Sequence, residues 1–219
     1  MTLSLNASRM KQRRSNRNAG RTARRRRAVL AGIDEAGRGP FAGPLTLGCV
    51  WCTPAVAAAA LVGIRDSKHL TPHGREEWFG RLKRHPDITF RVTRIGPATI
   101  DRRGMAWALH EGVRRLVRRC GKVRMVYLDG GLFAPQNVPH ATIIKGDERV
   151  PLIAAASVVA KVSRDRTMLR LHRQYPAYRF DLHKGYGTLL HRKILRAIGI
   201  SSVHRKGFCR RTLAEAPRT

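Results

Sequence analysis

Four carboxylates that directly follow short apolar runs are the residues of this chain best placed to do chemistry. Asp34 and Glu35 come after Val-Leu-Ala-Gly-Ile. Asp129 comes after Val-Arg-Met-Val-Tyr-Leu, and Asp147 comes after Ala-Thr-Ile-Ile-Lys-Gly. Because functional groups gather where the strands of an α/β sheet end, the four acids can converge there. Converging carboxylates repel one another unless cations hold them, and oxygen ligands of this kind suit Mg²⁺ or Mn²⁺. Two such ions, about 3.5 to 4 Å apart, can activate a water and stabilise the leaving oxygen of a phosphodiester.

Two points weigh against a shared site. Acids at these positions also serve as turn formers and helix caps. Neighbours on a regular strand face opposite ways, so Asp34 and Glu35 can act together only if the strand ends or bulges there.

Asp165 competes with Asp147 for the fourth position. It lies late in an apolar helical segment between Arg164 and Arg166, which favours a structural ion pair over a metal ligand. We prefer Asp147, because it follows a strand end and has Lys145 beside it to neutralise phosphate.

The segment after the first acids, Ala-Gly-Arg-Gly-Pro over residues 36–40, suits close contact with a ligand. Its glycines let the backbone approach and present N–H and C=O groups. A sugar hydroxyl is a suitable ligand for these backbone groups, although two glycines and a proline are also typical of an ordinary turn.

The charge of the chain indicates a polyanionic partner. Its 219 residues include 44 Lys and Arg against 14 Asp and Glu, a formal net charge of +30. Such an excess binds phosphate backbones even without base recognition. With 42% hydrophobic residues the chain is too apolar to be a wholly disordered basic tail. Composition alone does not separate an enzyme from a ribosomal or chromatin protein.

The first 27 residues differ from the rest. Residues 8–27 hold ten positive charges and no acid, which predicts an arm that is disordered alone and binds phosphates, or else a solubilising tail. No run is long and apolar enough for a membrane helix, and the N-terminus lacks the apolar core of a secretory signal. We therefore expect a cytoplasmic protein without a membrane contact.

Alternating apolar runs and helical periodicities predict an α/β fold with a sheet covered on both faces and a helical C-terminal part. Strands are expected over 29–33, 45–52, 88–95, 123–128 and 141–144, and helices over 73–83, 99–120, 152–172 and 189–197. Because Gly104 falls in the first turns of the second helix, that helix is expected to start later or bend. Cys49 and Cys52 resemble a metal or redox pair, but residues three apart on a strand face opposite ways, so we reject that role.

Taken together, these residues resemble the ribonuclease HII family, the type 2 ribonucleases H. The similarity begins with Gly-Ile-Asp-Glu-Ala-Gly-Arg-Gly-Pro at 32–40 and ends near Phe208. Its further parts are Asp-Ser-Lys at 66–68, Tyr-Leu-Asp-Gly at 127–130, Lys-Gly-Asp at 145–147, the alanine-rich run with Ser-Arg-Asp-Arg at 154–166, His-Lys-Gly-Tyr-Gly-Thr at 183–188 and His-Arg-Lys-Gly-Phe at 204–208.

The resemblance implies an RNase H-like mixed β-sheet flanked by helices. It also implies a catalytic domain over 28–208 that is helical from about residue 170, after the arm at 1–27 and before a tail at 209–219. The implied activity is a metal-dependent endonuclease that cuts 5′ to a ribonucleotide and leaves a 3′-hydroxyl and a 5′-phosphate. Two Mg²⁺ or Mn²⁺ ions would serve catalysis. The implied metal-binding carboxylates are Asp34, Glu35, Asp129 and Asp147.

The resemblance also implies the substrate contacts. The 2′-hydroxyl that distinguishes RNA from DNA would be read by the backbone of the Gly-Arg-Gly segment and by a tyrosine. In this sequence these residues are Gly37, Arg38, Gly39 and Tyr186, while Ser67, Lys68, His183 and Lys184 are placed to hold the nucleic-acid backbone.

The expected substrates are RNA/DNA hybrids and DNA duplexes containing ribonucleotides, and the expected role is ribonucleotide excision repair by a monomer. A sliding-clamp partner cannot be inferred from the sequence. The main alternative is a noncatalytic basic nucleic-acid-binding protein on the same fold, which would gain nothing from four acids held against phosphates. A different nuclease or recombinase on this fold is a further alternative, against which the Gly-Arg-Gly segment and Tyr186 argue.

Overall fold

A computed structural model of the chain describes residues 28–64 and 70–214, apart from the side chains of 211–213. The expected basic arm at 1–27 and the expected backbone contacts Ser67 and Lys68 lie outside these residues.

A five-stranded mixed sheet forms the centre of the molecule. Its strands follow the order β3-β2-β1-β4-β5, with β1 antiparallel to β2, β2 antiparallel to β3, and β4 parallel to both β1 and β5. The bounds are β1 (Leu30–Ala36), β2 (Leu45–Cys52), β3 (Thr89–Ile95), β4 (Met125–Asp129) and β5 (His140–Ile143). The expected mixed sheet is thus confirmed.

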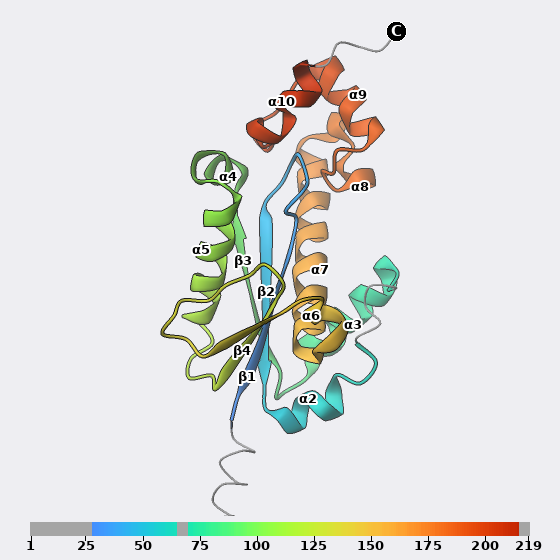
Figure 1. Cartoon of the computed structure of the whole chain (residues 1–219). Coiled ribbons are helices and arrows are strands. Elements are labelled where there is room, and N and C mark those ends of the chain that lie inside the picture. The colour runs from blue at the N-terminus through green and yellow to red at the C-terminus, as the bar shows by residue number, and fades with distance from the viewer. Residues whose placement is uncertain (1–27, 65–69, 215–219) are drawn as a thin grey trace, which may run out of the picture.

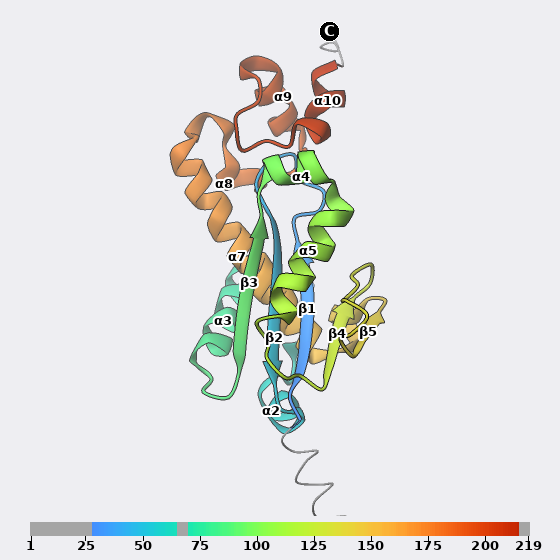
Figure 2. The same ribbon diagram turned by 90° about the vertical axis from the view of Figure 1, so that its left-hand side faces the viewer.

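Helices cover both faces of the sheet, and a helical C-terminal part lies at one end (Figures 1 and 2). Helices α4 and α5 lie on one face and α7 on the other, where α2 and α3 pack with it. The bounds are α2 (Pro54–Ala60), α3 (Pro72–Arg84), α4 (Pro97–Arg103), α5 (Met105–Val117), α6 (Gly146–Arg149), α7 (Pro151–Gln174), η2 (Pro176–Tyr178), α8 (Phe180–His183), α9 (Leu189–Ile198) and α10 (Lys206–Ala214).

Successive side chains of the buried strand β2 point to opposite faces of the sheet, so they enter two separate parts of the core. Cys49 packs in the cluster under α5, whereas Cys52 packs in the cluster under α7. The two thiols therefore face opposite sides of the sheet, as the sequence predicted. All four cysteines are buried and free, and the Sγ atoms of Cys49 and Cys120 lie 3.1 Å apart.

Two glycines let α7 approach the sheet closely. A Cβ on Gly32 would collide with the backbone of Leu152, and one on Gly48 would collide with that of Ala156. Because these strand positions lack side chains, the alanine-rich start of α7 lies directly against β1 and β2. This contact fixes the helix beside the acid-bearing end of β1.

Several boundaries differ from the sequence-based expectation. The expected helix over 99–120 is two helices, because Gly104 joins them with a φ of 83°. Strand β1 extends three residues past its expected end, because pairing with β2 continues as far as Ala36 and Thr46. Helix α2 was missed, and α10 crosses the expected boundary at residue 208. Among the described residues, none of the helices has the length and hydrophobicity needed to span a membrane.

Candidate active site

Asp34 and Asp129 lie side by side where β1 and β4 separate. The register of this parallel pair ends with Ile33 opposite Leu128, so the next residue of each strand is an aspartate. Asp34 is only 4% exposed. The pKa of Asp34 is raised to about 7, mainly by burial and in addition by the charges of Glu35 and Asp129, while the nearby Ser157 side chain lowers it. Because burial and neighbouring negative charges disfavour the ionised form of Asp34, a bound cation would stabilise its carboxylate.

Glu35 lies in the regular part of β1, where the ladder with β2 has no bulge. It pairs in register with Leu47 on β2, so it points to the face opposite Asp34. The charge of Asp129 raises the pKa of both Asp34 and Glu35, so both acids lie near Asp129, and their sharing of one site stays a prediction. Burial is the largest cause for Glu35, and Arg38 opposes it with its Nε 2.6 Å from Glu35 Oε1.

Asp147 is brought near Asp129 by a glycine. The N–H of Gly146 donates to Asp129 Oδ1 at 2.7 Å. A Cβ on Gly146 would lie 2.6 Å from the Ile153 side chain and 3.2 Å from the same carboxylate oxygen, so a larger residue does not fit. Asp147 follows in the short helix α6 and is 6% exposed.

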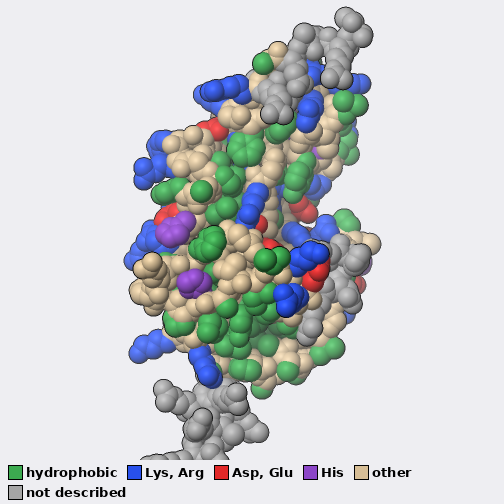
Figure 3. Space-filling model, viewed as in Figure 1, with side chains coloured by type: hydrophobic (Ala, Val, Ile, Leu, Met, Phe, Trp, Pro, Cys, Tyr) green, Lys and Arg blue, Asp and Glu red, His purple; other side chains and the backbone are tan. Residues whose placement is uncertain are grey.

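The four carboxylates suit a cation that takes its remaining ligands from water and from a substrate phosphate. In the part of the chain that the structure describes, no three His, Cys, Asp or Glu side chains form a ready-made metal site. Glu35 Oε2, however, is buried without a hydrogen-bond partner there. Acids with raised pKa values and an unsatisfied buried oxygen fit Mg²⁺ or Mn²⁺, because Mg²⁺ typically keeps several waters and binds one or two carboxylates plus a substrate phosphate. Figure 3 shows acidic side chains in the middle of the face on which β4, β5 and α6 lie, with Lys and Arg around them.

Asp165 forms the kind of contact that the sequence favoured. Its Oδ2 lies 3.9 Å from Arg75 on α3. The partner is thus a distant residue rather than the neighbouring arginines, since Arg166 pairs with Glu76 and Arg164 turns into the core.

The Gly-Arg-Gly segment after β1 is held by a buried arginine from the end of the chain. Arg205 is fully buried and donates to the carbonyls of Gly37 at 2.7 Å, Arg38 at 2.8 Å and Gly43 at 2.9 and 3.1 Å. The pKa of Arg205 is lowered to about 10, mainly by burial, so the side chain stays charged at neutral pH. Gly37 has a φ of 94°, which favours glycine.

A second buried arginine joins this segment to the tyrosine loop. Arg164 on α7 donates to the carbonyls of Ala42, Pro44 and Lys184 at 2.9 to 3.3 Å. Its guanidinium also lies 5.4 Å from the ring centroid of Tyr186, a cation–π distance.

Backbone hydrogen bonds complete the connection between the two loops. The N–H groups of Phe41 and Ala42 donate to the carbonyl of Gly185 at 2.8 and 3.2 Å. Tyr186 is 47% exposed although it is surrounded by these fixed groups, so its ring is presented to solvent on a rigid loop.

Three buried histidines support the tyrosine loop from behind. His183 stacks on His191 at 4.2 Å, and His191 lies 3.1 Å from His204 between their Nε2 atoms. His191 Nδ1 contacts the carbonyl of Tyr186 at 2.9 Å. Burial lowers the pKa of His191 and of His204 to about 4, so both are neutral at pH 7.

The expected backbone contacts of His183 and Lys184 stay predictions. Both ring nitrogens of His183 are engaged inside the protein, with the Tyr178 carbonyl and the Gly185 N–H. Lys184 Nζ donates to the carbonyl of Asp181. The structure thus shows both residues in the support of the loop.

The sequence interpretation missed Arg164, Arg205, His191 and His204 as parts of this site. Arg164, Arg205 and His204 lie inside segments that carry the family resemblance, so that resemblance was the available signal. The pattern of apolar residues could not find them, because charged side chains are usually exposed and histidines are often partly exposed.

Comparison with known proteins identifies the family. A sequence model described as ribonuclease HII matches residues 31–212. The chain is 40% identical to the ribonuclease HII of Chlamydia pneumoniae, over 83% of each chain. The chain belongs to the ribonuclease HII family. The recognition from sequence motifs is confirmed, and so is the expectation of an enzyme, a metal-dependent nuclease.

Solved structures agree with this ribonuclease HII fold. The match to the structure of the PCNA:RNase HII complex from Archaeoglobus fulgidus has a TM-score of 0.72 and 28% identity, covering 85% of this chain and 97% of that one. Bst-RNase HIII in complex with Mn²⁺ matches with a TM-score of 0.65 and 19% identity, covering 88% and 71%, and this likeness shows the fold alone.

Proposed function

We propose that this ribonuclease HII cuts the RNA strand of RNA/DNA hybrids and single ribonucleotides embedded in duplex DNA. The cut falls on the 5′ side of the ribonucleotide and leaves a 3′-hydroxyl and a 5′-phosphate. The observation that carries the proposal is the rigid connection between an acidic group and two loops able to contact a sugar. Asp34 and Asp129 lie where the pairing of β1 with β4 ends, and the segment that leaves β1 is hydrogen-bonded to the Tyr186 loop.

Asp34, Glu35, Asp129 and Asp147 are the proposed ligands of two divalent ions. When bound, such ions activate water and neutralise the charge that develops on the phosphate and the departing oxygen. The protein contributes a buried carboxylate at Asp34 and fixes Asp129 through the Gly146 N–H. Mn²⁺, the ion in the Bst-RNase HIII complex, and Mg²⁺ both suit this oxygen-rich set.

Gly37, Arg38, Gly39 and Tyr186 are the proposed readers of the 2′-hydroxyl. Arg205 already occupies the carbonyls of Gly37 and Arg38. Within the described residues no acceptor is found for the N–H groups of Arg38 and Gly39, which leaves them to donate to a sugar oxygen. Tyr186 lies across the loop junction, where its exposed ring can stack on the neighbouring sugar or base.

The surrounding basic residues are proposed to hold the nucleic-acid backbone. The net charge of +30 supports this, with Ser67, Lys68 and Lys184 as contacts and His183 acting through the loop that it supports. A sliding clamp is a proposed partner, since the Archaeoglobus fulgidus relative was solved in complex with PCNA. The proposed cellular role is ribonucleotide excision repair.

A denaturing-gel assay tests this function. The substrate is a DNA duplex with one ribonucleotide, incubated with Mg²⁺, Mn²⁺ or EDTA beside an all-DNA duplex. Metal-dependent cutting only at the 5′ side of the ribonucleotide is expected. Tight, salt-sensitive binding without cutting would instead support a noncatalytic nucleic-acid-binding protein.

A further inference from the structure

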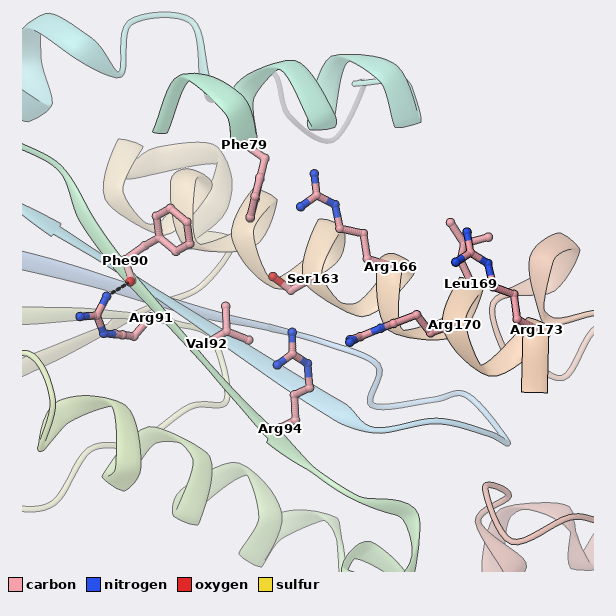
Figure 4. A pocket seen from close by; sticks show the side chains of 10 residues that line it. All are labelled: Phe79, Phe90, Arg91, Val92, Arg94, Ser163, Arg166, Leu169, Arg170 and Arg173. Carbon is pink, nitrogen blue, oxygen red and sulfur yellow. Dashed lines mark hydrogen bonds between the residues drawn. The ribbon is translucent and has the colours of Figure 1, made fainter. Parts of the chain in front are cut away.

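A second basic surface lies between the edge strand β3 and the outer side of α7. It is a groove of about 650 Å³ whose wall also includes α3 (Figure 4). Its floor contains apolar side chains such as Phe90 and Val92, and five arginines surround it. These are Arg91, Arg94, Arg166, Arg170 and Arg173.

The positions of the arginines follow from the local structure. Arg166, Arg170 and Arg173 are spaced i, i+4 and i+7, so they share one face of α7. Arg94 lies two residues beyond Val92 on β3 and therefore faces the same side as the groove floor. In Figure 4 the side chains of Arg94 and Arg170 extend into the space between β3 and α7, and that of Arg166 extends toward α3.

Most of this charge has no carboxylate partner. Arg166 pairs with Glu76 at 2.5 Å, but Arg94, Arg170 and Arg173 form no ion pair with the described residues. The pKa of Arg94 is lowered by partial burial and by the charge of Arg170. The positive charges of these arginines thus lie close together in the groove, and a bound anion would reduce their mutual repulsion.

The groove is separate from the candidate active site. It borders β3, whereas the acids lie on β1, β4 and α6, with β2 between these strands in the sheet. Helix α7 therefore faces the acids with Ser157 on one side and lines the groove with another.

We propose that this groove binds the phosphate backbone of a nucleic-acid segment other than the one held at the carboxylates. The three arginines of α7 span about 10 Å along the helix at 1.5 Å per residue. Successive phosphates of one strand advance about 3.4 Å along a duplex axis, so the row matches a linear polyanion better than a single phosphate. The apolar floor suits the sugars between the phosphates. The chain's own N-terminal segment is excluded as occupant, because residues 8–27 carry ten positive charges and no acid.

The test measures binding of a labelled all-DNA duplex and of a labelled DNA single strand to the full chain in EDTA, by fluorescence anisotropy over a salt series. The test variant combines Arg94→Gln, Arg170→Gln and Arg173→Gln. The matched control combines Arg118→Gln, Arg119→Gln and Lys122→Gln, three exposed cations near the end of α5. Because EDTA prevents cleavage and the probes contain no ribonucleotide, the result is independent of the proposed function.

For the groove variant, the slope of log affinity against log salt should become shallower by about 2.7 for the duplex, at about 0.9 per lost phosphate contact. The control and a variant with lysine at the same three groove positions should keep their slopes. A loss confined to the duplex or to the single strand would identify the form that the groove holds. An equal loss in groove variant and control, or no loss with either probe, would overturn the proposal. A labelled polyglutamate peptide is the third probe. If the groove variant lost affinity for this peptide and kept its affinity for both DNA probes, the groove would be a surface for an acidic protein and the proposal would be overturned. Thermal unfolding of all variants checks that they fold.

Discussion

The buried guanidinium of Arg205 gives the sharpest test of how the Gly-Arg-Gly segment is positioned. Its three nitrogens form four hydrogen bonds of 2.7 to 3.1 Å to the carbonyls of Gly37, Arg38 and Gly43. Arg205→Lys keeps the charge but offers one nitrogen, which cannot reach three separated carbonyls in the geometry of the guanidinium fork. At least one carbonyl is then left buried without a donor.

The expected loss of stability follows from these bonds. A hydrogen bond to a charged group contributes about 1.5 to 3 kcal/mol, and an unsatisfied buried carbonyl costs about 1 to 3 kcal/mol. We expect a net loss of about 3 kcal/mol in the free energy of unfolding, because the lysine recovers part of the contact. For a chain of this size that loss lowers Tm by about 6 to 12 °C.

The same variant should also lose activity while it is folded. A shift of about 1 Å in a positioning loop can cost about 100-fold in rate. We therefore expect kcat/KM on a duplex with one ribonucleotide to fall by about 100-fold at a temperature well below Tm. Binding of an all-DNA duplex in EDTA should stay nearly unchanged, because no phosphate contact has been removed.

Thermal unfolding by circular dichroism and cleavage kinetics provide the two measurements, with Arg118→Lys on the exposed end of α5 as the matched control. An Arg205→Lys protein with the Tm and the cleavage rate of the unmodified chain would refute the claim that this side chain holds the loop. A lower Tm with an unchanged rate would show that Arg205 supports the fold but does not position the substrate-reading segment.

Three more outcomes are expected. Asp129→Asn should abolish cleavage and leave duplex binding intact, since asparagine can still accept the Gly146 N–H; full activity in the gel assay would remove Asp129 from the metal site. Tyr186→Ala should slow cleavage at single ribonucleotides by about 5-fold to 150-fold, as loss of about 1 to 3 kcal/mol of stacking implies, with only a small fall in Tm from the lost contact with Arg164; an unchanged rate would place the reading of the 2′-hydroxyl elsewhere. The pKa values of His191 and His204, about 4 in the folded protein, lie below the ordinary 6.5, so the folded state binds fewer protons. Their stability contribution should be complete above about pH 6.5 and be lost as the pH falls toward 4, by up to about 3 kcal/mol for one histidine. Urea unfolding between pH 7.5 and 4.5 measures this, and His204→Asn should flatten the dependence; an equally steep loss in that variant would assign the effect to other groups.

Apolar runs and helical periodicity in the sequence were sufficient to predict most of the strands and helices. The apolar run over 45–52 coincides with β2, and the segment 152–172 became α7 with small changes at its ends. Gly104 interrupts a helical periodicity where a glycine disfavours helix, and the structure has two helices there. In contrast, β1 extends through Asp34 and Glu35 because its ladder with β2 continues, which no property of the acids themselves indicates.

Contacts between segments distant in the sequence decided which side chains pair and which surfaces form. Asp165 pairs with Arg75 on another helix, although two arginines flank it in sequence, because side chains adjacent along a helix do not face each other. The basic groove depends likewise on β3 and α7 lying side by side in space.

The sequence by itself determined the family, the order of the main strands and helices, and the four acids proposed as metal ligands, because each depends on motifs or on short-range periodicity. Only the tertiary structure decided that Arg164 and Arg205 are buried and join two loops far apart in the chain. A charged side chain has no local signal for burial. Its desolvation becomes favourable only when several carbonyls from other segments converge on it, and that convergence is a property of the packed fold.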